Sequence, residues 1–375
     1  MKIVHATEID IGGTATVLHL LLTNQIADTS ISSLACVIPK TLESTLTTIP
    51  KETFRTYERT GRNIKSLYNF CSAFAKTVWQ QKPDIVHIHS TFAGILGRLI
   101  LLFMLPFRRP KIVYCPHGFS FLMEGSNIKR KIFSYLEVLL SLATHKIICV
   151  SNYEKNSAIN SGINPNKIVV IHNGTPIIEA STSTQNSPYT GAKEIKNYLF
   201  AGRLDAAKGF DLLLSAMRRI DDKSIHLTVA GISSNEVHDS AKLDNINYLG
   251  WMKSEQLRPY FIHADALILP SRWEGFPMVV LEAMSLGIPV LASNCTSLSE
   301  AVDHGQTGLL FDTSDIDNIS NALTAIDQNT LKQMGVKGRE RFQKYFTSDI
   351  MTKSTISLYS KLKHNNGMRN LKGAV

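Results

Sequence analysis

Short runs of β-branched and apolar residues alternate with longer helical patterns along most of this chain, and the alternation occurs twice. Strands that alternate with helices form parallel sheets covered by helices on both faces. The sequence therefore predicts an α/β protein with two Rossmann-like, doubly wound parallel-sheet domains that face a cleft. In such sheets, ligands bind beyond the carboxyl ends of the strands. The predicted strands are residues 2–6, 34–38, 85–88, 111–115, 146–150 and 168–171 in the first half, and 197–201, 226–230, 246–249, 266–269, 289–292 and 308–311 in the second.

A polar stretch rich in Ser and Thr, residues 180–190, separates the two series of strands. A chain of 375 residues is also long for one hydrophobic core, which favours two domains. We expect an N-terminal domain over residues 1–178, a linker over 179–192 and a C-terminal domain over 193–345. The last residues, 346–375, begin with a helical pattern, and we expect this helix to pack back on the N-terminal domain.

The net charge of +9 lies entirely in the first half of the chain. Residues 1–178 contain 19 Lys and Arg against 10 Asp and Glu, whereas residues 179–375 contain 21 of each kind. This asymmetry favours an anionic partner for the N-terminal half, such as a lipid headgroup or nucleic acid, although many basic chains have no such partner.

The chain has the features of a cytoplasmic protein. Residues 1–7 read as a strand that leads into a glycine turn rather than as a secretory signal. The longest apolar run, residues 99–107, is far shorter than the roughly 20 residues that span a bilayer, so no transmembrane helix is predicted. The five cysteines lack the spacing of metal ligands, and we expect reduced core residues.

The strongest functional signal is the segment from Ser271 to Met284, which follows a predicted strand. A glycine loop and a proline at a predicted helix start place Glu274 on the loop and Glu282 on the helix. A helix start offers unpaired amides and the positive end of the helix dipole to a diphosphate, and a helix carboxylate can accept both hydroxyls of a ribose. The alternative is that both glutamates are solvated charges. The predicted helix start comprises Gly275, Phe276, Pro277 and Met278.

A second signal follows the first predicted strand of the C-terminal domain. Arg203 and Lys208 lie in the loop between this strand and a predicted helix, where a phosphate would bind. A diphosphate leaving group gains negative charge as its bond breaks, and fixed cations stabilise this charge without a metal ion. We therefore predict that Arg203 and Lys208 hold a diphosphate. Surface salt bridges are the alternative.

These motifs resemble those of glycosyltransferase family 4, whose members retain the donor's anomeric configuration and have two facing Rossmann-like domains, the GT-B fold. The resemblance covers nearly the whole chain, and the pair Glu274 and Glu282 is its specific part. It implies that Arg203 and Lys208 hold the diphosphate of a nucleotide sugar, that Glu282 binds the ribose and that Glu274 positions the transferred sugar. The other matching residues are Gly12, Gly13, His117, Gly118, Ser151, Asn173 and Gly174.

The resemblance also implies the remaining substrate contacts and the reaction. Gly12 and Gly13 would approach the donor phosphate or the acceptor, and His117 would contact the sugar near its anomeric carbon. The expected donor is a UDP-sugar, with a GDP-sugar second. We expect transfer of a hexose or N-acetylhexosamine to a saccharide acceptor on a polyprenyl or other lipid carrier, in the biosynthesis of lipopolysaccharide O-antigen, capsule or exopolysaccharide.

Two histidine positions are candidates for the site on the pattern of residues alone, independently of the resemblance. His117 follows a predicted strand and precedes a glycine, which lets a ligand approach closely. His87 and His89 point to the same side of one strand, and only His89, at the strand end, is a candidate for the site. Core packing is an equally good reading of His89, and we do not expect these histidines to be metal ligands. Ser151 and Asn173 are weaker candidates for acceptor or sugar contacts.

A divalent metal ion is not expected. Many sugar transferases hold such an ion with an Asp-x-Asp pair, and the match in this chain is Asp315 with Asp317. This pair precedes a helical pattern, so helix capping is the better interpretation. With Arg203 and Lys208 available to balance the diphosphate charge, we expect no metal and no other cofactor.

Two segments of the first half suggest contact with an anionic membrane surface. Residues 98–111 and 129–142 join bulky apolar residues to clusters of Lys and Arg. Such segments can lie in a headgroup layer with their cations on anionic lipids. Two helices buried against their sheet are the alternative. We expect a peripheral enzyme on the cytoplasmic face of the inner membrane.

Other classes of protein fit the sequence less well. A dinucleotide-dependent oxidoreductase requires Gly-x-Gly-x-x-Gly after the first strand, a spacing that residues 10–16 lack. A non-enzymatic protein that binds nucleic acid or a membrane would use the basic surface, but no nucleic-acid-binding motif is present, and we expect no nucleic-acid partner. A nucleotide-sugar epimerase of the same fold is the nearest alternative. A glycogen-type synthase usually has a longer N-terminal half.

Overall fold

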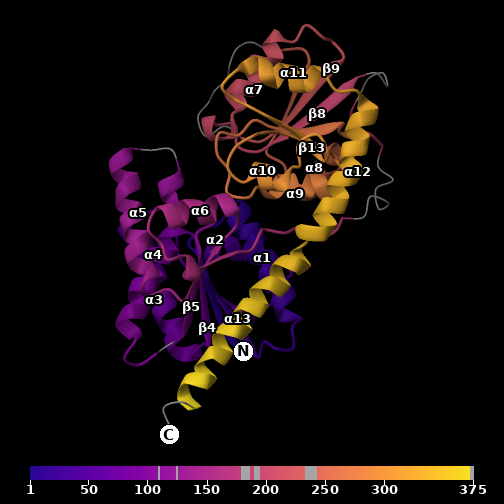
Figure 1. Ribbon diagram of the computed structural model, residues 1–375. Helices are drawn as coiled ribbons and strands as arrows, with labels where there is room; N and C mark the ends of the chain where they lie inside the picture. Colours follow the sequence, from indigo (N-terminus) through magenta and orange to yellow (C-terminus); the bar gives the residue numbers. More distant parts are fainter. Residues whose placement is uncertain (109, 124–125, 179–185, 190–194, 233–242, 372–375) are drawn as a thin grey trace. The chain divides into compact units, whose positions relative to one another are not determined.

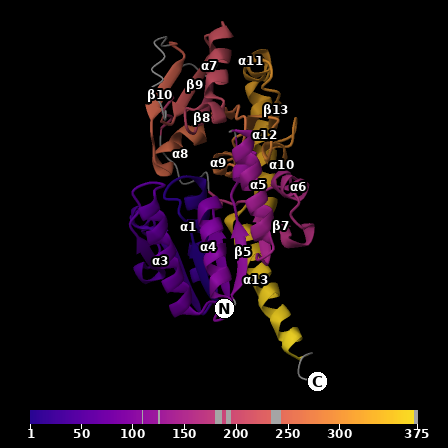
Figure 2. The same cartoon turned by 90° about the vertical axis from the view of Figure 1, so that its left-hand side faces the viewer.

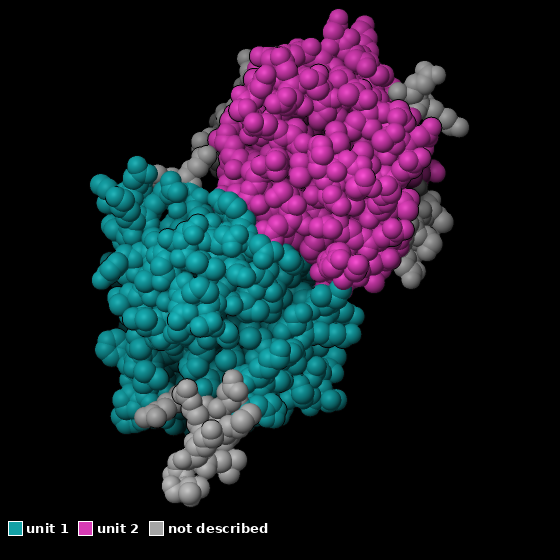
Figure 3. Space-filling view, viewed as in Figure 1, with its two compact units in different colours: residues 1–174, 348–375 teal, residues 175–347 magenta. Residues whose placement is uncertain are grey.

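The computed structural model describes residues 1–108, 110–123, 126–178, 186–189, 195–232 and 243–371. The chain forms two compact units, unit 1 with residues 1–174 and 348–375, and unit 2 with residues 175–347 (Figure 3). Each unit contains a parallel sheet with covering helices, which confirms the predicted fold class (Figure 1).

The unit boundaries differ by a few residues from the domain boundaries predicted at 178 and 345. Residues 175–178 and 346–347 belong to unit 2. Within the predicted linker, residues 179–185 and 190–192 lie outside the described part of the chain.

Unit 1 is built on a seven-stranded sheet with the strand order β3-β2-β1-β4-β5-β6-β7. The order reverses direction between β1 and β4, which makes this the point where a doubly wound sheet binds ligands. Its elements are β1 (Lys2–Ala6), α1 (Gly13–Ile26), β2 (Ser33–Pro39), α2 (Lys40–Glu43), η1 (Lys51–Thr53), β3 (Phe54–Tyr57), α3 (Ile64–Gln81), β4 (Ile85–His89), α4 (Thr91–Met104), β5 (Lys111–Cys115), η2 (Ser120–Leu122), α5 (Asn127–Ser141), β6 (Lys146–Cys149), α6 (Asn152–Asn160), η3 (Pro165–Lys167), β7 (Ile168–Val170) and α13 (Ser348–Leu371).

The two faces of this sheet bury different sets of side chains because successive strand residues point to opposite sides. Val4, Val86 and Ile88 face the layer of α3 and α4, with Phe70 and Phe74 of α3 in the same apolar cluster. Figure 2 shows α3, α4 and α5 side by side over this face, and α4 contacts both of the other helices. The alternate strand residues face α1 and α13.

The final helix, α13, packs against α1 and the sheet of unit 1. The Asn24 side-chain amide donates a hydrogen bond to the Thr352 hydroxyl across 3.1 Å. Lys363 forms an ion pair of 2.9 Å with Asp84 at the start of β4. The chain thus returns to unit 1 after completing unit 2.

Unit 2 is built on a six-stranded sheet with the order β10-β9-β8-β11-β12-β13, which reverses between β8 and β11. Helix α7 contacts α11, and α9 contacts α12. Its elements are β8 (Lys196–Ala201), η5 (Ala206–Lys208), α7 (Phe210–Arg219), β9 (Ile225–Ala230), β10 (Ile246–Gly250), α8 (Ser254–His263), β11 (Ala266–Leu269), α9 (Met278–Ser285), β12 (Val290–Ser293), α10 (Leu298–Ala301), β13 (Gly308–Phe311), α11 (Ile316–Thr324) and α12 (Gln328–Tyr345).

Each predicted strand is present, and its ends differ by at most one residue from the predicted ends. One strand of the structure was not predicted. The short edge strand β3 pairs with β2 through residues 54–57. Phe, Thr and Tyr favour strands, but the segment Phe-Arg-Thr-Tyr is only four residues long and lacks a run of β-branched residues. His117 therefore follows the fifth strand of unit 1 rather than the fourth.

Candidate active site

The loops that follow β8 and β11 meet at the reversal point of the unit 2 sheet. Lys208 comes from the loop after β8 and Glu274 from the loop after β11, and these two strands are neighbours. The Lys208 ammonium donates a hydrogen bond of 2.6 Å to Glu274 Oε1. The Ser271 hydroxyl donates a second one, of 2.7 Å, to the same oxygen. Glu274 is buried, so the pair lies at the base of the loops.

Several contacts hold the two loops together. Gly209 has φ +66°, and a Cβ atom on it would lie 1.8 Å from the Pro270 carbonyl oxygen, so only glycine allows this approach. Arg272 donates two hydrogen bonds of 2.7 Å to the Asp211 carboxylate, a bidentate pair that connects the β11 loop to α7. Gly209, Asp211 and Arg272 thus support the site, a role that was not predicted for them from the sequence.

Arg203 stands apart from the Lys208 pair. Its guanidinium forms an ion pair of 3.0 Å with Asp205, and its side chain is 68% exposed. Asp205 also caps η5, because its side chain accepts a hydrogen bond from the Lys208 amide. The structure therefore brings Lys208 to Glu274 and leaves Arg203 on the surface of the same loop.

The predicted helix start is present at α9. Pro277 is the N-cap residue and Met278 opens the helix, so Glu274 lies on the loop and Glu282 on the helix as expected. Phe276 packs against Phe346, which fixes the chain just before the helix. Burial raises the pKa of the Glu282 carboxyl to about 7. A proline has no side-chain acceptor for capping, so the first amides of α9 remain available to a ligand.

The loop after β1 in unit 1 has the geometry expected of Gly12 and Gly13. Gly12 is the N-cap residue of α1 with φ +90°, and Gly13 is the first residue of the helix. Apart from its chain neighbours, no atom of the described residues lies within 4 Å of the position of a Cβ atom on Gly12. The start of α1 is thus open on the side of Gly12, and its backbone conformation requires glycine.

His117 lies at the carboxyl end of β5 in a conformation that is rare for residues other than glycine. Its φ is +53°, and Gly118 follows with φ +105°. Backbone conformations of this kind are found preferentially at functional sites. The Glu154 carboxylate accepts hydrogen bonds from the Gly118 amide, at 2.8 Å, and the Val150 amide, at 2.7 Å. These bonds hold the turn that carries His117.

Ser151 has a structural position. It is buried, and its hydroxyl caps α6 by accepting a hydrogen bond from the Glu154 amide at 3.0 Å. Through this cap it orients the carboxylate that holds the His117 turn. The structure gives Ser151 a supporting place, and its contact with a substrate stays a prediction.

His117 is the first of three histidines joined by hydrogen bonds on the α1 and α13 side of the sheet. His117 Nε2 lies 2.9 Å from His89 Nδ1, and His89 Nε2 lies 2.9 Å from His5 Nδ1. His5 Nε2 lies 2.9 Å from the amide oxygen of Gln25 on α1. Burial lowers the pKa of His117 and of His5 to about 4, and burial together with the neighbouring histidines holds the pKa of His89 well below its usual value. The three rings are therefore neutral at pH 7.

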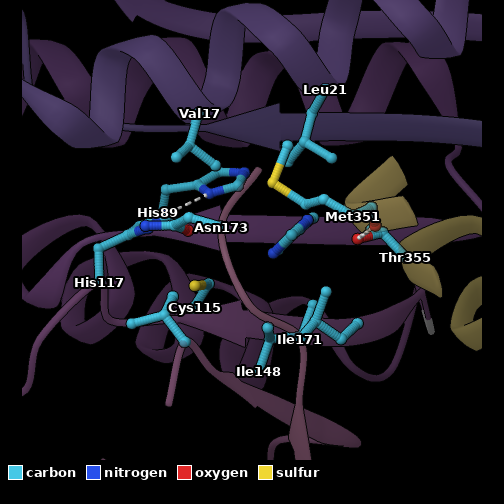
Figure 4. Close-up of a pocket in the computed structure, with 12 residues that line it drawn as sticks. Val17, Leu21, His89, Cys115, His117, Ile148, Ile171, Asn173, Met351 and Thr355 are labelled. Carbon is cyan, nitrogen blue, oxygen red and sulfur yellow. Dashed lines mark hydrogen bonds between the residues drawn. The ribbon is translucent and has the colours of Figure 1, made fainter. Parts of the chain in front are cut away.

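A small pocket in unit 1 is lined by His89 and His117, together with His87 (Figure 4). His89, His117 and Asn173 lie on one side of it, and Met351 and Thr355 of α13 lie on the opposite side. The structure thus brings together His89, His117 and Asn173 of the predicted sugar or acceptor contacts.

His5, His87 and His89 also have ligand atoms within 4.8 Å of one another, close enough for a metal site. His5 Nδ1 and His89 Nε2 contact each other and His87 Nδ1 lies 2.6 Å from the Tyr359 hydroxyl, whereas His87 Nε2 is buried without a hydrogen-bond partner among the described residues. The absence of a metal therefore stays a prediction. Asp315 caps α11 and accepts a hydrogen bond from the Asp317 amide, which confirms the capping interpretation of that pair.

The predicted membrane segments need one correction. Arg98 is fully buried and pairs with Glu137 across 2.7 Å, with its guanidinium 3.9 Å from the centroid of the Tyr114 ring. It stabilises the contact between α4 and α5 and cannot reach a lipid headgroup. Among the described residues, no helix is both long and apolar enough to cross a membrane.

Two family models match the chain, one in each half. Residues 11–177 match "Glycosyltransferase Family 4", and residues 184–346 match "Glycosyl transferases group 1". An uncharacterized 41.2 kDa protein in the cps region of Klebsiella pneumoniae is 32% identical over 96% of this chain and 99% of its own length. The UDP-Gal:alpha-D-GlcNAc-diphosphoundecaprenol alpha-1,3-galactosyltransferase of Escherichia coli is 28% identical, over 74% of this chain and 75% of its own.

Solved structures share the fold over most of the chain. Anabaena HepE in complex with UDP and glucose has a TM-score of 0.76 at 17% identity, covering 96% of this chain and 100% of its own. The apo form of the lipopolysaccharide outer core galactosyltransferase WaaB has a TM-score of 0.70 at 18% identity, with the same coverage.

Proposed function

Since this chain belongs to glycosyltransferase family 4, we propose that it transfers a hexose or N-acetylhexosamine from a nucleotide sugar to a saccharide acceptor with retention of configuration. It is a glycosyltransferase of the GT-B fold, related to enzymes of O-antigen and capsule biosynthesis. A UDP-sugar is the proposed donor and a lipid-linked glycan the proposed acceptor. The galactosyltransferase relative is named for substrates of both kinds, which supports this choice.

The observation that carries the proposal is the ion pair between Lys208 and Glu274. A buried carboxylate holds the ammonium at the carboxyl ends of the strands where the unit 2 sheet reverses. With its position fixed, Lys208 can stabilise the charge that develops on a diphosphate during bond cleavage. Arg203 is exposed on the same loop, and its side chain can turn toward the other phosphate group of the diphosphate.

Glu274 has a second task in this proposal. Its Oε1 accepts hydrogen bonds from Lys208 and Ser271, so the carboxylate has a fixed orientation. We assign Oε2 to a hydroxyl of the transferred sugar. Glu282, one to two turns into α9, accepts the ribose hydroxyls, and the first amides of α9, after Gly275 and Pro277, bind the diphosphate.

The proposed reaction proceeds on one face of the sugar. The acceptor hydroxyl forms a bond to the anomeric carbon from the side on which the diphosphate leaves, and the bond between that carbon and the diphosphate oxygen breaks. The leaving diphosphate takes the proton of the acceptor hydroxyl, and the nucleoside diphosphate departs with the electron pair. The configuration at the anomeric carbon is retained, and the cations of Lys208 and Arg203 balance the charge without a divalent ion.

The experiment that tests this proposal measures transfer from UDP-, GDP- and ADP-sugars in the presence of EDTA. We expect UDP-sugar binding, slow hydrolysis without an acceptor, and transfer to lipid-linked saccharides with the α or β anomer of the donor preserved by NMR. A product with the opposite anomer would exclude retention. Conversion of the donor sugar without an acceptor would identify an epimerase instead.

We also propose that unit 1 lies on an anionic membrane surface, on the cytoplasmic side of the inner membrane. The outer face of α5 exposes five apolar side chains spaced by four and three residues, which places them on one side of the helix. They are 49–73% exposed, far more than a core-facing stripe would be. This α5 stripe consists of Ile128, Ile132, Tyr135, Leu139 and Leu142.

Charge supports a lipid rather than a protein partner for the α5 stripe. Lys129, Arg130 and Lys131 are exposed in the first turns of the same helix, and Phe103 and Phe107 are 83% and 66% exposed on and after the neighbouring α4. Unit 1 carries 24 Lys and Arg against 11 Asp and Glu, whereas unit 2 carries 16 against 20. Apolar residues beside cations on a strongly basic unit match the boundary between acyl chains and anionic headgroups.

A further inference from the structure

The hydrogen bonds determine which ring nitrogen carries the proton in each of the three linked histidines. An amide oxygen accepts hydrogen bonds and never donates one. Because Gln25 presents its amide oxygen to His5 Nε2 at 2.9 Å, the proton of neutral His5 must be on Nε2. His5 Nδ1 is then an unprotonated acceptor. Its neighbour at 2.9 Å, His89 Nε2, must carry the proton of His89.

The same step applies once more along the row. With its proton on Nε2, His89 has an unprotonated Nδ1, so this atom accepts a hydrogen bond from His117 Nε2 at 2.9 Å. His117 therefore has its proton on Nε2, directed into the protein, and a bare lone pair on Nδ1. That Nδ1 is buried and has no hydrogen-bond partner within the described part of the chain.

A buried acceptor without a partner costs free energy unless a ligand supplies a donor. The turn that carries His117 has a strained φ of +53°, and the Glu154 carboxylate holds this turn through the Gly118 amide despite both costs. A sugar hydroxyl can donate to Nδ1. A diphosphate oxygen, which carries no proton at neutral pH, cannot.

We propose that Gln25, His5 and His89 are positioning residues that fix His117 as the Nε2–H tautomer, so that Nδ1 accepts a hydrogen bond from a hydroxyl of the sugar substrate. The tautomer follows from the protein alone, and the hydroxyl contact rests on the proposed transferase function. His117 is thus an acceptor that selects a hydroxyl, rather than a donor that contacts the phosphate. The row ends at the buried Gln25, so it sets a proton position and does not conduct protons to solvent.

The tautomers can be measured in the full chain labelled with ¹⁵N-histidine, by ¹H–¹⁵N correlation through the ring carbons at pH 7. We expect protonated Nε2 and bare Nδ1 in His117, His89 and His5. His145 calibrates the spectrum, because its Nδ1 accepts from the Ile112 amide and its tautomer is therefore known. A proton on His117 Nδ1 overturns the proposal. So does the loss of the Nε2–H signals of His5 and His89 on adding Zn²⁺, which would make the cluster a metal site.

A UDP-sugar tests the hydroxyl contact separately. Hydrogen bonding to a bare imidazole nitrogen moves its ¹⁵N resonance upfield, so the UDP-sugar should shift His117 Nδ1 and UDP alone should not. An equal shift with UDP would mean contact with the nucleotide and overturn the hydroxyl assignment. The tautomer result stands or falls without any transferase activity, which separates failure of this inference from failure of the proposed function.

Variants of Gln25 test the positioning role. Gln25→Met removes the acceptor at similar volume, and we expect a second His117 tautomer and a fall of up to about tenfold in kcat/KM. Gln25→Glu keeps an acceptor and should show the wild-type His117 tautomer and the wild-type kcat/KM. Thr352→Val, which removes a neighbouring contact between α1 and α13, is the matched control and should change neither. An unchanged His117 tautomer in Gln25→Met overturns the proposal, and if that variant does not fold, the wild-type spectrum decides.

Discussion

Lys208 Nζ lies 2.6 Å from Glu274 Oε1, although 66 residues separate the two side chains in sequence. The proximity results from the sheet order, since β8 and β11 are neighbours and both loops leave from the same edge. Ser271 donates to the same oxygen, so the carboxylate has two partners and a defined position. A cation fixed in this way needs little reorganisation when a diphosphate binds.

Replacing Lys208 with Ala should lower kcat by roughly 100- to 1000-fold, the usual effect of removing a group that stabilises transition-state charge. Glu274→Gln should also lower kcat, because Lys208 loses the anion that positions it. Initial rates with a UDP-sugar measure both effects. Arg219→Ala, which breaks an exposed pair with Asp317 in the same unit, is the control and should retain activity. Wild-type rates in Lys208→Ala with intact circular dichroism would refute the assigned role.

Gly209→Ala should destabilise unit 2 by about 2 kcal/mol or more and reduce activity. The added Cβ atom would lie 1.8 Å from the Pro270 carbonyl oxygen, in a backbone conformation with φ +66°. The two loops must then separate, which moves Lys208 away from Glu274. Urea denaturation measures the stability. Gly202→Ala in the same loop is the control, because its Cβ atom has its nearest neighbours at 3.9 Å, and equal losses in both variants would contradict this explanation.

Arg98→Ala should lower the free energy of unfolding by about 3 kcal/mol, because it leaves the Glu137 carboxylate buried without its counter-ion. The double variant Arg98→Met with Glu137→Leu should recover part of this loss, since it removes both charges. Urea midpoints of Arg98→Met, of Glu137→Leu and of the double variant give the coupling between the two residues. If the double variant loses the sum of both single losses, the pair makes no joint contribution.

The predicted strands and the two carboxylates of the donor site follow from local patterns, whereas the edge strand β3 and the supports of the site do not. Glu274 and Glu282 are identifiable because a strand, a glycine loop and a helix start occur in immediate succession. Arg98 is on an apolar helix in a basic region, and only its pairing with Glu137 explains its burial. Gln25 depends on a contact with His5 from another element, a relationship that neither propensity nor periodicity encodes.

Glu282→Gln should stabilise the protein at pH 8 and have little effect at pH 5. The pKa of this carboxyl is about 7 in the folded protein because of burial, against 4.5 as its reference value. The folded state thus holds a proton that the unfolded state releases between pH 4.5 and 7, and stability falls as the pH rises through this range. Above pH 7 the buried carboxylate costs on the order of 3 kcal/mol, which the neutral amide avoids.

Urea denaturation of both proteins at pH 5 and pH 8 measures this difference, and UDP-sugar titration follows the ribose contact. We expect weaker UDP-sugar binding by Glu282→Gln, since an amide has only one acceptor oxygen for the two ribose hydroxyls. The same stability difference at both pH values would show that the folded pKa of Glu282 is close to normal.

Replacing Ile132 and Leu139 of the α5 stripe with Ser should lower the binding of the protein to anionic vesicles roughly tenfold. Both side chains are about half exposed, so each can bury further apolar area in the headgroup boundary. Sedimentation with phosphatidylglycerol vesicles at low salt measures the bound fraction. Higher salt should weaken binding of the wild-type chain, because the exposed Lys129, Arg130 and Lys131 attract the headgroups through screened charges.

Val336→Ser is the control for this surface, because Val336 is 61% exposed but lies on α12 of unit 2. It should leave vesicle binding unchanged. Vesicles of neutral lipid should bind the wild-type chain weakly, since the basic residues of unit 1 then have no counter-charge. If the wild-type chain ignores anionic vesicles but forms a dimer that Ile132→Ser with Leu139→Ser disrupts, the α5 stripe is a protein interface and the membrane proposal is wrong. If the variant with Ile132→Ser and Leu139→Ser loses vesicle binding but keeps its activity on a soluble acceptor, the α5 stripe lies outside the catalytic machinery.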